Sequence, residues 1–163
     1  MSKTRKNQAS VPRPCACTTV RTASRALARA FDAALIDSDL SVTQLAVLRA
    51  IERQKNEPLS SVADALSMDR TSLYRSVATM QRQGWVTVGT GRDGRSKSAR
   101  VTKVGRKVLD GAAPQWELVQ TAIVQRFGLA RWKSMVAEIA ELMEVANAVE
   151  DEMSAVRQQG DDA

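Results

Sequence analysis

The sequence predicts a mainly α-helical protein with a small β-wing, and three observations lead to this fold class. Apolar residues recur every three or four positions over several segments, which is the spacing of amphipathic helices. Alanine is abundant and aromatic residues make up only 4% of the chain, a composition that favours helices. One segment departs from this pattern, because residues 85–102 read as two short strands around a glycine-rich centre.

The N-terminal part of the chain is expected to hold a tail and one helix. Residues 1–14 are basic and contain prolines, which predicts a disordered tail without the apolar run of a signal peptide. An amphipathic helix follows from residue 16 to about residue 37, with Val20, Leu27 and Phe31 on one face. No segment approaches the ~18–20 apolar residues that span a bilayer, so a cytoplasmic protein is expected.

Three shorter helices are expected next, and each has a candidate cap. Ser41 or Thr43 can cap a helix that ends near Gln54. After a turn, Ser60 is the expected cap of a helix of about two turns. Asp69 can cap the third helix, because its carboxylate can accept the free backbone N–H groups of the first turn.

The third of these helices has the side chains that suit a DNA groove. Leu73, Val77 and Met80 form its buried stripe, and Gly84 supplies the left-handed residue that ends it. A helix in the major groove presents hydroxyls and arginines on one side while its other side is anchored in a core. The expected DNA-binding residues are Arg70, Thr71, Ser72, Tyr74, Arg75 and Thr79, and Arg75 can pair with guanine.

The hairpin that follows is expected to carry a cationic tip. Arg92, Arg95 and Lys97 lie on a glycine-flanked loop that can enter a neighbouring minor groove. Asp93 is interpreted as a partner within the loop that orients an arginine, because a bare carboxylate facing phosphate would be repelled. Thr102 is well placed to cap the next helix.

This order of elements predicts a winged helix-turn-helix domain at residues 41–106, flanked by helical arms. The N-terminal arm comprises residues 15–40 and the C-terminal arm residues 107–158, and both are expected to act as dimerisation helices. Pro114 should bend or divide the first C-terminal helix. Residues 159–163 are expected to form a second disordered tail.

Charge and composition limit the possible functions. The net charge is +6, but residues 1–107 carry 20 basic and 8 acidic side chains, whereas residues 108–163 carry 4 and 10. Such a cationic half favours nucleic acid as the partner, although a single basic helix face is often only solvated. The chain has no histidine and only two cysteines, which argues against zinc sites and histidine acid–base chemistry. We therefore expect no enzyme activity, no metal and no cofactor.

The sequence resembles the MarR family of bacterial transcription regulators over residues 20–148. The resemblance lies in LSVTQLAVLRAI (40–51), in LSSVADALSMDRTSLYRSVATMQRQGWV (59–86) and above all in DGRSKSARVTKVGRKVL (93–109). The last stretch matches the wing pattern of the family, an Asp-x-Arg followed by a strand and a Thr-x-x-Gly helix start.

The resemblance implies an obligate homodimer that binds a pseudo-palindromic operator. It also implies a recognition helix that starts near Arg70 and a wing arginine, Arg95, in the minor groove. The usual Thr-Arg pair of the family appears here as Tyr74-Arg75, so one expected contact is missing. The apolar stripe of the last helix is expected to pair with its copy; the alternative is that this helix folds back on its own domain.

The sequence allows more than one mechanism by which DNA binding could be regulated. Many members of this family are repressors released by small phenolic or carboxylic ligands, and Arg21, Arg25 and Trp116 are candidates to line such a cavity. Alternatively, these arginines contact DNA or solvent and Trp116 belongs to the core.

A second mechanism is oxidant sensing through Cys15 and Cys17, since a helix N-terminus lowers thiol pKa values. Alternatively, the cysteines are small apolar residues at the start of a helix. A non-specific architectural DNA-binding protein is the remaining interpretation.

Overall fold

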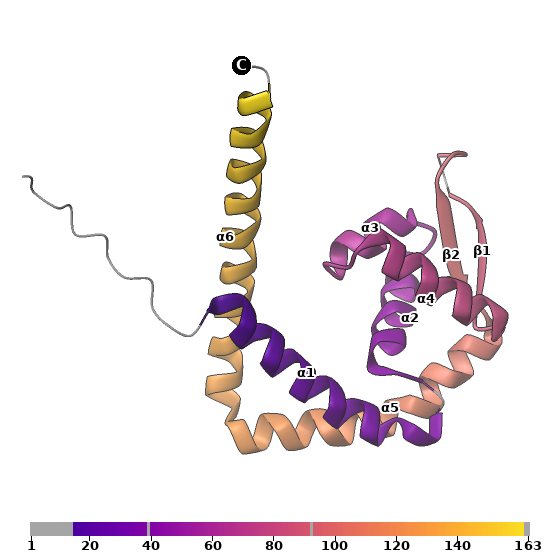
Figure 1. Cartoon of the computed structure of the whole chain (residues 1–163). Coiled ribbons are helices and arrows are strands. Elements are labelled where there is room, and N and C mark those ends of the chain that lie inside the picture. Colours follow the sequence, from indigo (N-terminus) through magenta and orange to yellow (C-terminus); the bar gives the residue numbers. More distant parts are fainter. Residues whose placement is uncertain (1–14, 39, 92, 162–163) are drawn as a thin grey trace, which may run out of the picture. The chain divides into compact units, whose positions relative to one another are not determined.

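The computed structural model describes residues 15–38, 40–91 and 93–161, and it confirms the mainly helical fold with a small wing. The chain divides into two compact units, Met1–Glu117 and Leu118–Ala163. None of the helices in the described ranges is long and apolar enough to cross a membrane. The elements in chain order are α1 (Ala16–Ala34), the short 3-10 helix η1 (Ile36–Ser38), α2 (Val42–Gln54), α3 (Leu59–Ala65), α4 (Arg70–Arg82), β1 (Val86–Thr90), β2 (Lys97–Val101), α5 (Lys103–Phe127) and α6 (Leu129–Asp161), as Figure 1 shows.

Two of the three predicted caps are present in the helix-turn-helix. The Ser41 hydroxyl accepts a hydrogen bond from the Gln44 amide at 3.2 Å, and Gln44 Oε1 accepts one from the Ser41 amide at 2.9 Å. Asp69 Oδ1 accepts the Ser72 amide at 3.0 Å and so begins α4. The prediction that Ser60 caps α3 is wrong, because this helix starts directly after Pro58. Pro58 pairs with Ser98 of β2 in an isolated β-bridge, which holds the N-terminus of α3 against the wing.

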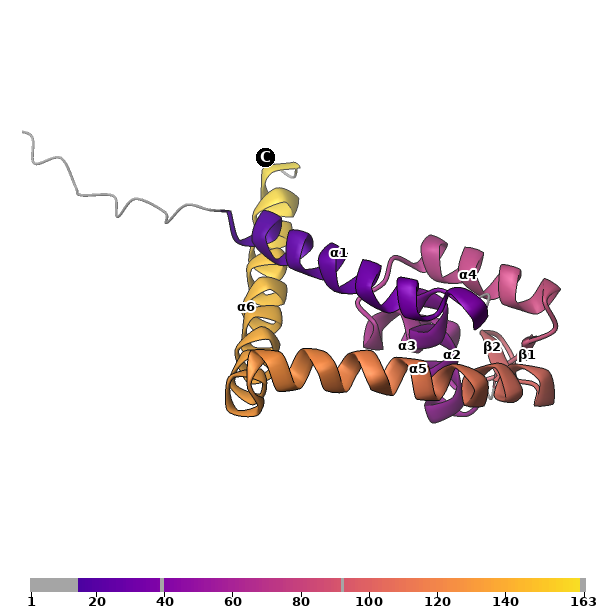
Figure 2. The same ribbon diagram turned by 90° about the horizontal axis from the view of Figure 1, so that it is seen from below.

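The core of the first unit lies between α2, α3, α4 and the wing. Leu45 and Leu48 of α2 pack with Leu73 and Met80 of α4, and each of these side chains is at most 2% exposed. This packing confirms the predicted buried stripe of α4. The view from below shows the first turns of α5 apart from α4 (Figure 2), and most residues on the other faces of α4 are exposed.

The wing is a two-stranded antiparallel hairpin joined tightly to its neighbouring helices. Its register pairs Val86 with Val101 and Thr90 with Lys97. Gly84 has the expected positive φ, +75°, at the end of α4. The Thr102 hydroxyl donates to the Gly84 carbonyl at 2.7 Å and accepts the Gly105 amide at 3.0 Å, which confirms Thr102 as a cap.

The helical arms differ from the prediction mainly at their ends. α1 stops at Ala34, three residues earlier than expected, and Phe31 is the buried residue within it. α5 continues through Pro114 instead of dividing there, since a single proline removes only one helical hydrogen bond and the bonds around it persist. α6 extends to Asp161, so residues 159–161 of the expected tail are helical. Residues 1–14 and 162–163 lie outside the described ranges.

Candidate nucleic-acid interface

The predicted recognition residues lie on the open side of α4. Arg70, Thr71, Ser72, Tyr74 and Arg75 are all exposed, whereas the opposite side of the helix is fixed in the core. Because the buried side chains leave α4 little freedom to rotate, these exposed groups are held in a defined direction. This arrangement fits a helix that reads the edges of bases.

The Thr79 hydroxyl forms two hydrogen bonds within α4. Its hydroxyl donates to the Arg75 carbonyl at 3.2 Å and accepts a hydrogen bond from Arg82 Nη2 at 3.2 Å. Thr79 is half-buried, so its hydroxyl is less open than those of the first turn. It therefore orients Arg82 as well as presenting its own methyl and hydroxyl groups.

The wing tip is organised by one carboxylate. Asp93 Oδ1 accepts hydrogen bonds from the Arg95 amide at 3.0 Å, the Ser96 amide at 2.8 Å and the Ser96 hydroxyl at 2.8 Å. These bonds, with the Ser96 amide as the largest contribution, lower the pKa of the Asp93 carboxyl below its usual value. Asp93 is thus an intraloop partner, as predicted, but it holds the backbone of Arg95 and not the guanidinium. Arg92 lies outside the described residues.

One hollow joins the start of α4 to the wing. Arg70 and Tyr74 of α4 line it together with Arg95 and Lys97 of the wing, and its volume is about 420 Å³. We call it the α4–wing hollow, and its further lining residues are Pro58, Ser60 and Ser96. The structure therefore brings four of the predicted DNA-binding residues to one place.

The sequence did not predict that Ser60 lines the α4–wing hollow, because Ser60 was expected to cap a helix. The only sequence signal that could have indicated its place is the proline two residues earlier, which pairs with the wing.

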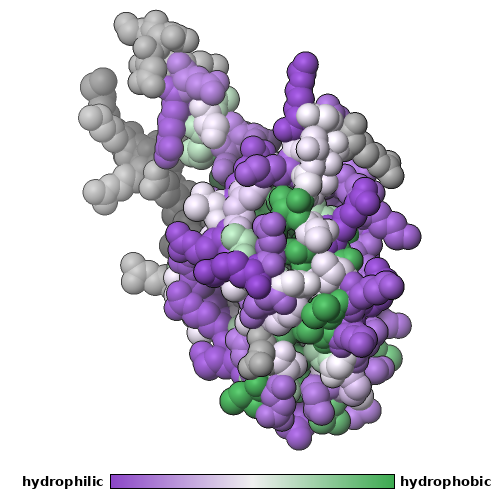
Figure 3. Space-filling model, turned by 90° about the vertical axis from the view of Figure 1, so that its right-hand side faces the viewer, coloured by the Kyte–Doolittle hydropathy of each residue, from purple (hydrophilic) through white to green (hydrophobic). Residues whose placement is uncertain are grey.

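From the wing side, hydrophilic residues cover most of the visible surface, and hydrophobic ones form small separate patches (Figure 3). A cationic groove with hydroxyls and one aromatic ring can contact phosphates and sugars.

Comparison with known proteins decides the family. The MarR family profile matches residues 38–96, which comprise the helix-turn-helix and most of the wing. The M. tuberculosis transcriptional regulator MosR, solved in complex with DNA, is 36% identical with a TM-score of 0.74; the match covers 83% of this chain and 98% of MosR. The chain belongs to the MarR family. This family consists of DNA-binding transcriptional regulators.

Other comparisons agree with this MarR-family fold. A second MosR structure matches with 34% identity and a TM-score of 0.72, covering 82% of this chain and 96% of MosR. The S. aureus MepR–DNA complex has a TM-score of 0.68 at 15% identity, covers 81% of this chain and 98% of MepR, and supports the fold alone. A comparison with curated protein sequences finds no match.

In this MarR-family protein, Trp116 lies beside cations of α2. Its ring stacks on Phe31 of α1 with centroids 6.2 Å apart, and the Arg49 guanidinium lies 4.1 Å from its centroid. Burial lowers the pKa of Arg49, and the neighbouring charge of Arg53 lowers it further. A hollow of about 440 Å³, here called the Trp116 hollow, is lined by Ala46, Arg49, Glu52, Arg53, Leu66 and Trp116.

The Trp116 hollow differs from the predicted ligand site. Arg21 and Arg25 are exposed on α1 and do not line it. Arg49 and Arg53 take the place of these two cations beside the indole. Their spacing of four residues on one helix, which puts both on one face, was the available sequence signal.

The two cysteines of the MarR-family chain are exposed and unpaired. Cys15 is the residue before the first turn of α1. The nearby Thr18 amide, Thr18 hydroxyl and Cys17 amide lower the pKa of the Cys15 thiol, the first of these contributing most. These polar neighbours favour the thiolate, which is the reactive form of cysteine.

Proposed function

We propose that this protein is a homodimeric repressor that acts in the cytoplasm, binds a pseudo-palindromic operator and is released by a small aromatic or carboxylic ligand. The observation that carries the proposal is the α4–wing hollow, where Arg70 and Tyr74 of an anchored helix meet Arg95 and Lys97 of the wing. The 36% identity to MosR, a transcriptional regulator solved in complex with DNA, supports it.

The exposed residues of α4 and the wing suggest separate roles in this proposal. Arg75 pairs with a guanine in the major groove, since a guanidinium matches two acceptors of that base. Arg70, Thr71 and Ser72 lie in the first turn of α4, where the Arg70 guanidinium and the two hydroxyls can contact a phosphate. Arg95 enters the minor groove at the tip of the wing, held in register by Asp93.

The proposed homodimer rests on apolar surface that the chain leaves uncovered. Val136, Leu142, Val149 and Met153 of α6 are between 41% and 53% exposed. On α1, Val20 is 43% and Leu27 is 38% exposed. A second copy can cover such surfaces, and a two-fold axis would place two recognition helices one turn of DNA, about 34–36 Å, apart.

We place the proposed effector in the Trp116 hollow. An aromatic ring can lie against the edge of the Trp116 indole, and a carboxylate can pair with Arg49 or Arg53. Because Trp116 contacts both α1 and α2, a ligand there can shift the helical arm against the DNA-binding residues. The experiment is to titrate aromatic carboxylates into the wild type and into Arg53→Gln, with release of DNA as the readout.

Genome-wide footprinting of the purified protein tests the function as a whole. The proposal predicts a few sites with two half-sites about one helical turn apart, and a dimer in sedimentation experiments. An architectural DNA-binding protein would instead bind every duplex with similar affinity. Uniform binding, or a monomer without preference for any promoter fragment, contradicts the proposal.

Oxidant control is the second candidate, and the exposed Cys15 with its lowered thiol pKa favours it. In this mechanism peroxide takes two electrons from the thiols of Cys15 and Cys17, a disulfide forms, and the peroxide is reduced to water. Operator affinity with and without peroxide is measured for the wild type and for Cys15→Ser/Cys17→Ser. An equal response of both proteins to peroxide excludes this mechanism.

A further inference from the structure

A third hollow lies where the end of α2 faces β2 and the start of α5, away from the α4–wing hollow. Its volume is about 540 Å³, within the range of small-molecule sites. We call it the α2–β2 hollow. It is lined by Ile51, Glu52, Lys55, Asn56, Ala99, Arg100, Val101 and Arg106.

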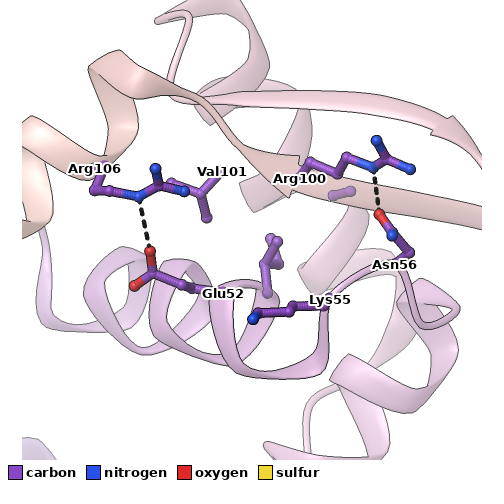
Figure 4. Close-up of a pocket in the computed structure, with 8 residues that line it drawn as sticks. Glu52, Lys55, Asn56, Arg100, Val101 and Arg106 are labelled. Atoms are coloured by element: carbon purple, nitrogen blue, oxygen red, sulfur yellow. Dashed lines mark hydrogen bonds and ion pairs between the residues drawn. The ribbon is translucent and has the colours of Figure 1, made fainter.

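The α2–β2 hollow has cations at both ends and apolar side chains between them. Figure 4 shows Arg106 at one end and Arg100 at the other, with Lys55, the residue after α2, between the two. The apolar part comes from Ile51 and Ala99, which are 3% and 4% exposed, and from Val101. With Glu52 as the single acidic residue of the lining, the hollow carries a formal charge of about +2.

Among the described residues, each arginine bonds through Nε to one side-chain partner and keeps further donors. Arg106 Nε lies 3.1 Å from Glu52 Oε1, in a pair whose side chains are 57% and 42% exposed. Arg100 Nε donates to Asn56 Oδ1. A guanidinium has five N–H donors, so both arginines can bind an anion while these bonds persist. An exposed ion pair contributes little, and an incoming carboxylate can therefore compete with Glu52.

The turn after α2 is strained in a way that shapes this hollow. Lys55 and Asn56 have φ values of +28° and +73°, which residues other than glycine rarely adopt. This backbone presents the Asn56 side chain to Arg100 of β2. Strained residues that line a hollow are common at functional sites.

We propose that the α2–β2 hollow binds a small dicarboxylate with an apolar carbon chain. One carboxylate pairs with Arg106 and the other with Arg100, because guanidinium groups bind carboxylates through two parallel hydrogen bonds. The methylene chain lies over the half-buried Val101, with the buried Ile51 and Ala99 beneath it, and Lys55 adds a third positive charge. This site goes beyond the proposed repressor function, and binding to it requires neither DNA nor the Trp116 hollow.

Calorimetric titration of the full-length protein with adipate, in the absence of DNA, tests the proposal. Hexanoate is the comparison ligand, because it has the same chain length with one carboxylate. We expect adipate to bind at least about tenfold more tightly than hexanoate, since a charge-assisted hydrogen bond has this effect. Arg100→Gln and Arg106→Gln should each remove the advantage of adipate.

Two further variants separate this site from its surroundings. Lys107→Gln removes a neighbouring charge of α5 outside the lining and should leave adipate binding unchanged. Glu52→Gln should tighten adipate binding, a gain that misfolding cannot produce. Equal affinities for adipate and hexanoate would overturn the proposal. So would equal losses in Lys107→Gln and Arg106→Gln.

Discussion

Gly105 lies against the backbone of Trp85, so closely that a Cβ atom at position 105 would be 2.1 Å from the Trp85 carbonyl oxygen. The same carbonyl accepts the Thr102 amide at 2.9 Å, and the Thr102 hydroxyl caps α5. The exit from α4, the base of the wing and the start of α5 therefore meet at this glycine. Its position explains why the Thr-x-x-Gly pattern follows the wing.

Gly105→Ala should destabilise the protein by roughly 2–3 kcal/mol, because the added methyl group meets backbone that cannot move aside. Urea denaturation at a fixed protein concentration measures the free energy of unfolding. Gly111→Ala is the matched control in the same helix, since its Cβ meets nothing within 4 Å. That variant should be more stable by about 0.5–1 kcal/mol. Equal effects of the two substitutions would contradict this account.

Asp93→Ala should loosen the wing tip, because the Arg95 and Ser96 amides lose their acceptor. Hydrogen exchange at these two amides should become faster, and DNA affinity should fall roughly threefold to tenfold. Asp93→Asn is the control, since its amide oxygen can still accept hydrogen bonds, and a smaller change is expected. Unchanged exchange in Asp93→Ala would show that the turn does not depend on this carboxylate.

The wing tip should become less ordered when the pH is lowered far enough to protonate Asp93. The pKa of Asp93 is lowered from 3.8 in the folded protein, so the ionised carboxylate stabilises the wing tip fully above pH 3.8. This stabilisation is lost as the pH falls through the lowered pKa of the folded protein. Protection of the Arg95 and Ser96 amides should therefore be constant from neutral pH to about pH 5, in the wild type.

Arg75→Ala and Arg95→Ala should weaken operator binding in different ways. Arg75→Ala should cost about 1–3 kcal/mol and relax the preference at one base position. Arg95→Ala should weaken binding with less change in base preference and reduce the salt slope by about one. Fluorescence anisotropy with operator variants at several salt concentrations measures both effects. Arg126→Ala, in α5, is the control, and a loss as large as that of Arg75→Ala would show that the effect is only general charge.

Leu142→Glu and Val149→Glu should convert the proposed dimer to monomers, because each would place a carboxylate in the apolar surface proposed to pair with a second copy. Analytical ultracentrifugation measures the oligomeric state. Operator affinity should fall together with the dimer, since a monomer contacts only one half-site. Glu144→Gln, on the same helix, should remain dimeric. A dimer that survives both glutamate substitutions would exclude α6 as the interface.

Several local features of this protein follow from neighbouring residues along the chain. Ser41, Asp69 and Thr102 cap their helices through bonds to amides three residues later, and Gly84 ends α4 through its own φ. Such features depend on a few consecutive residues, so residue type and spacing can indicate them. They do not suffice everywhere, because Ser60 fits the same pattern and α3 starts after Pro58 instead. The cationic surplus of residues 1–107 is likewise a property of the chain.

Contacts between distant side chains, in contrast, became visible in the folded protein. The tertiary structure placed Ser60 beside Arg95, Arg49 beside Trp116, and Arg100 and Arg106 at the two ends of one apolar hollow. It also showed that α5 passes Pro114 without a break. These relationships depend on how segments far apart in the chain pack against a shared core, and no local spacing records that packing.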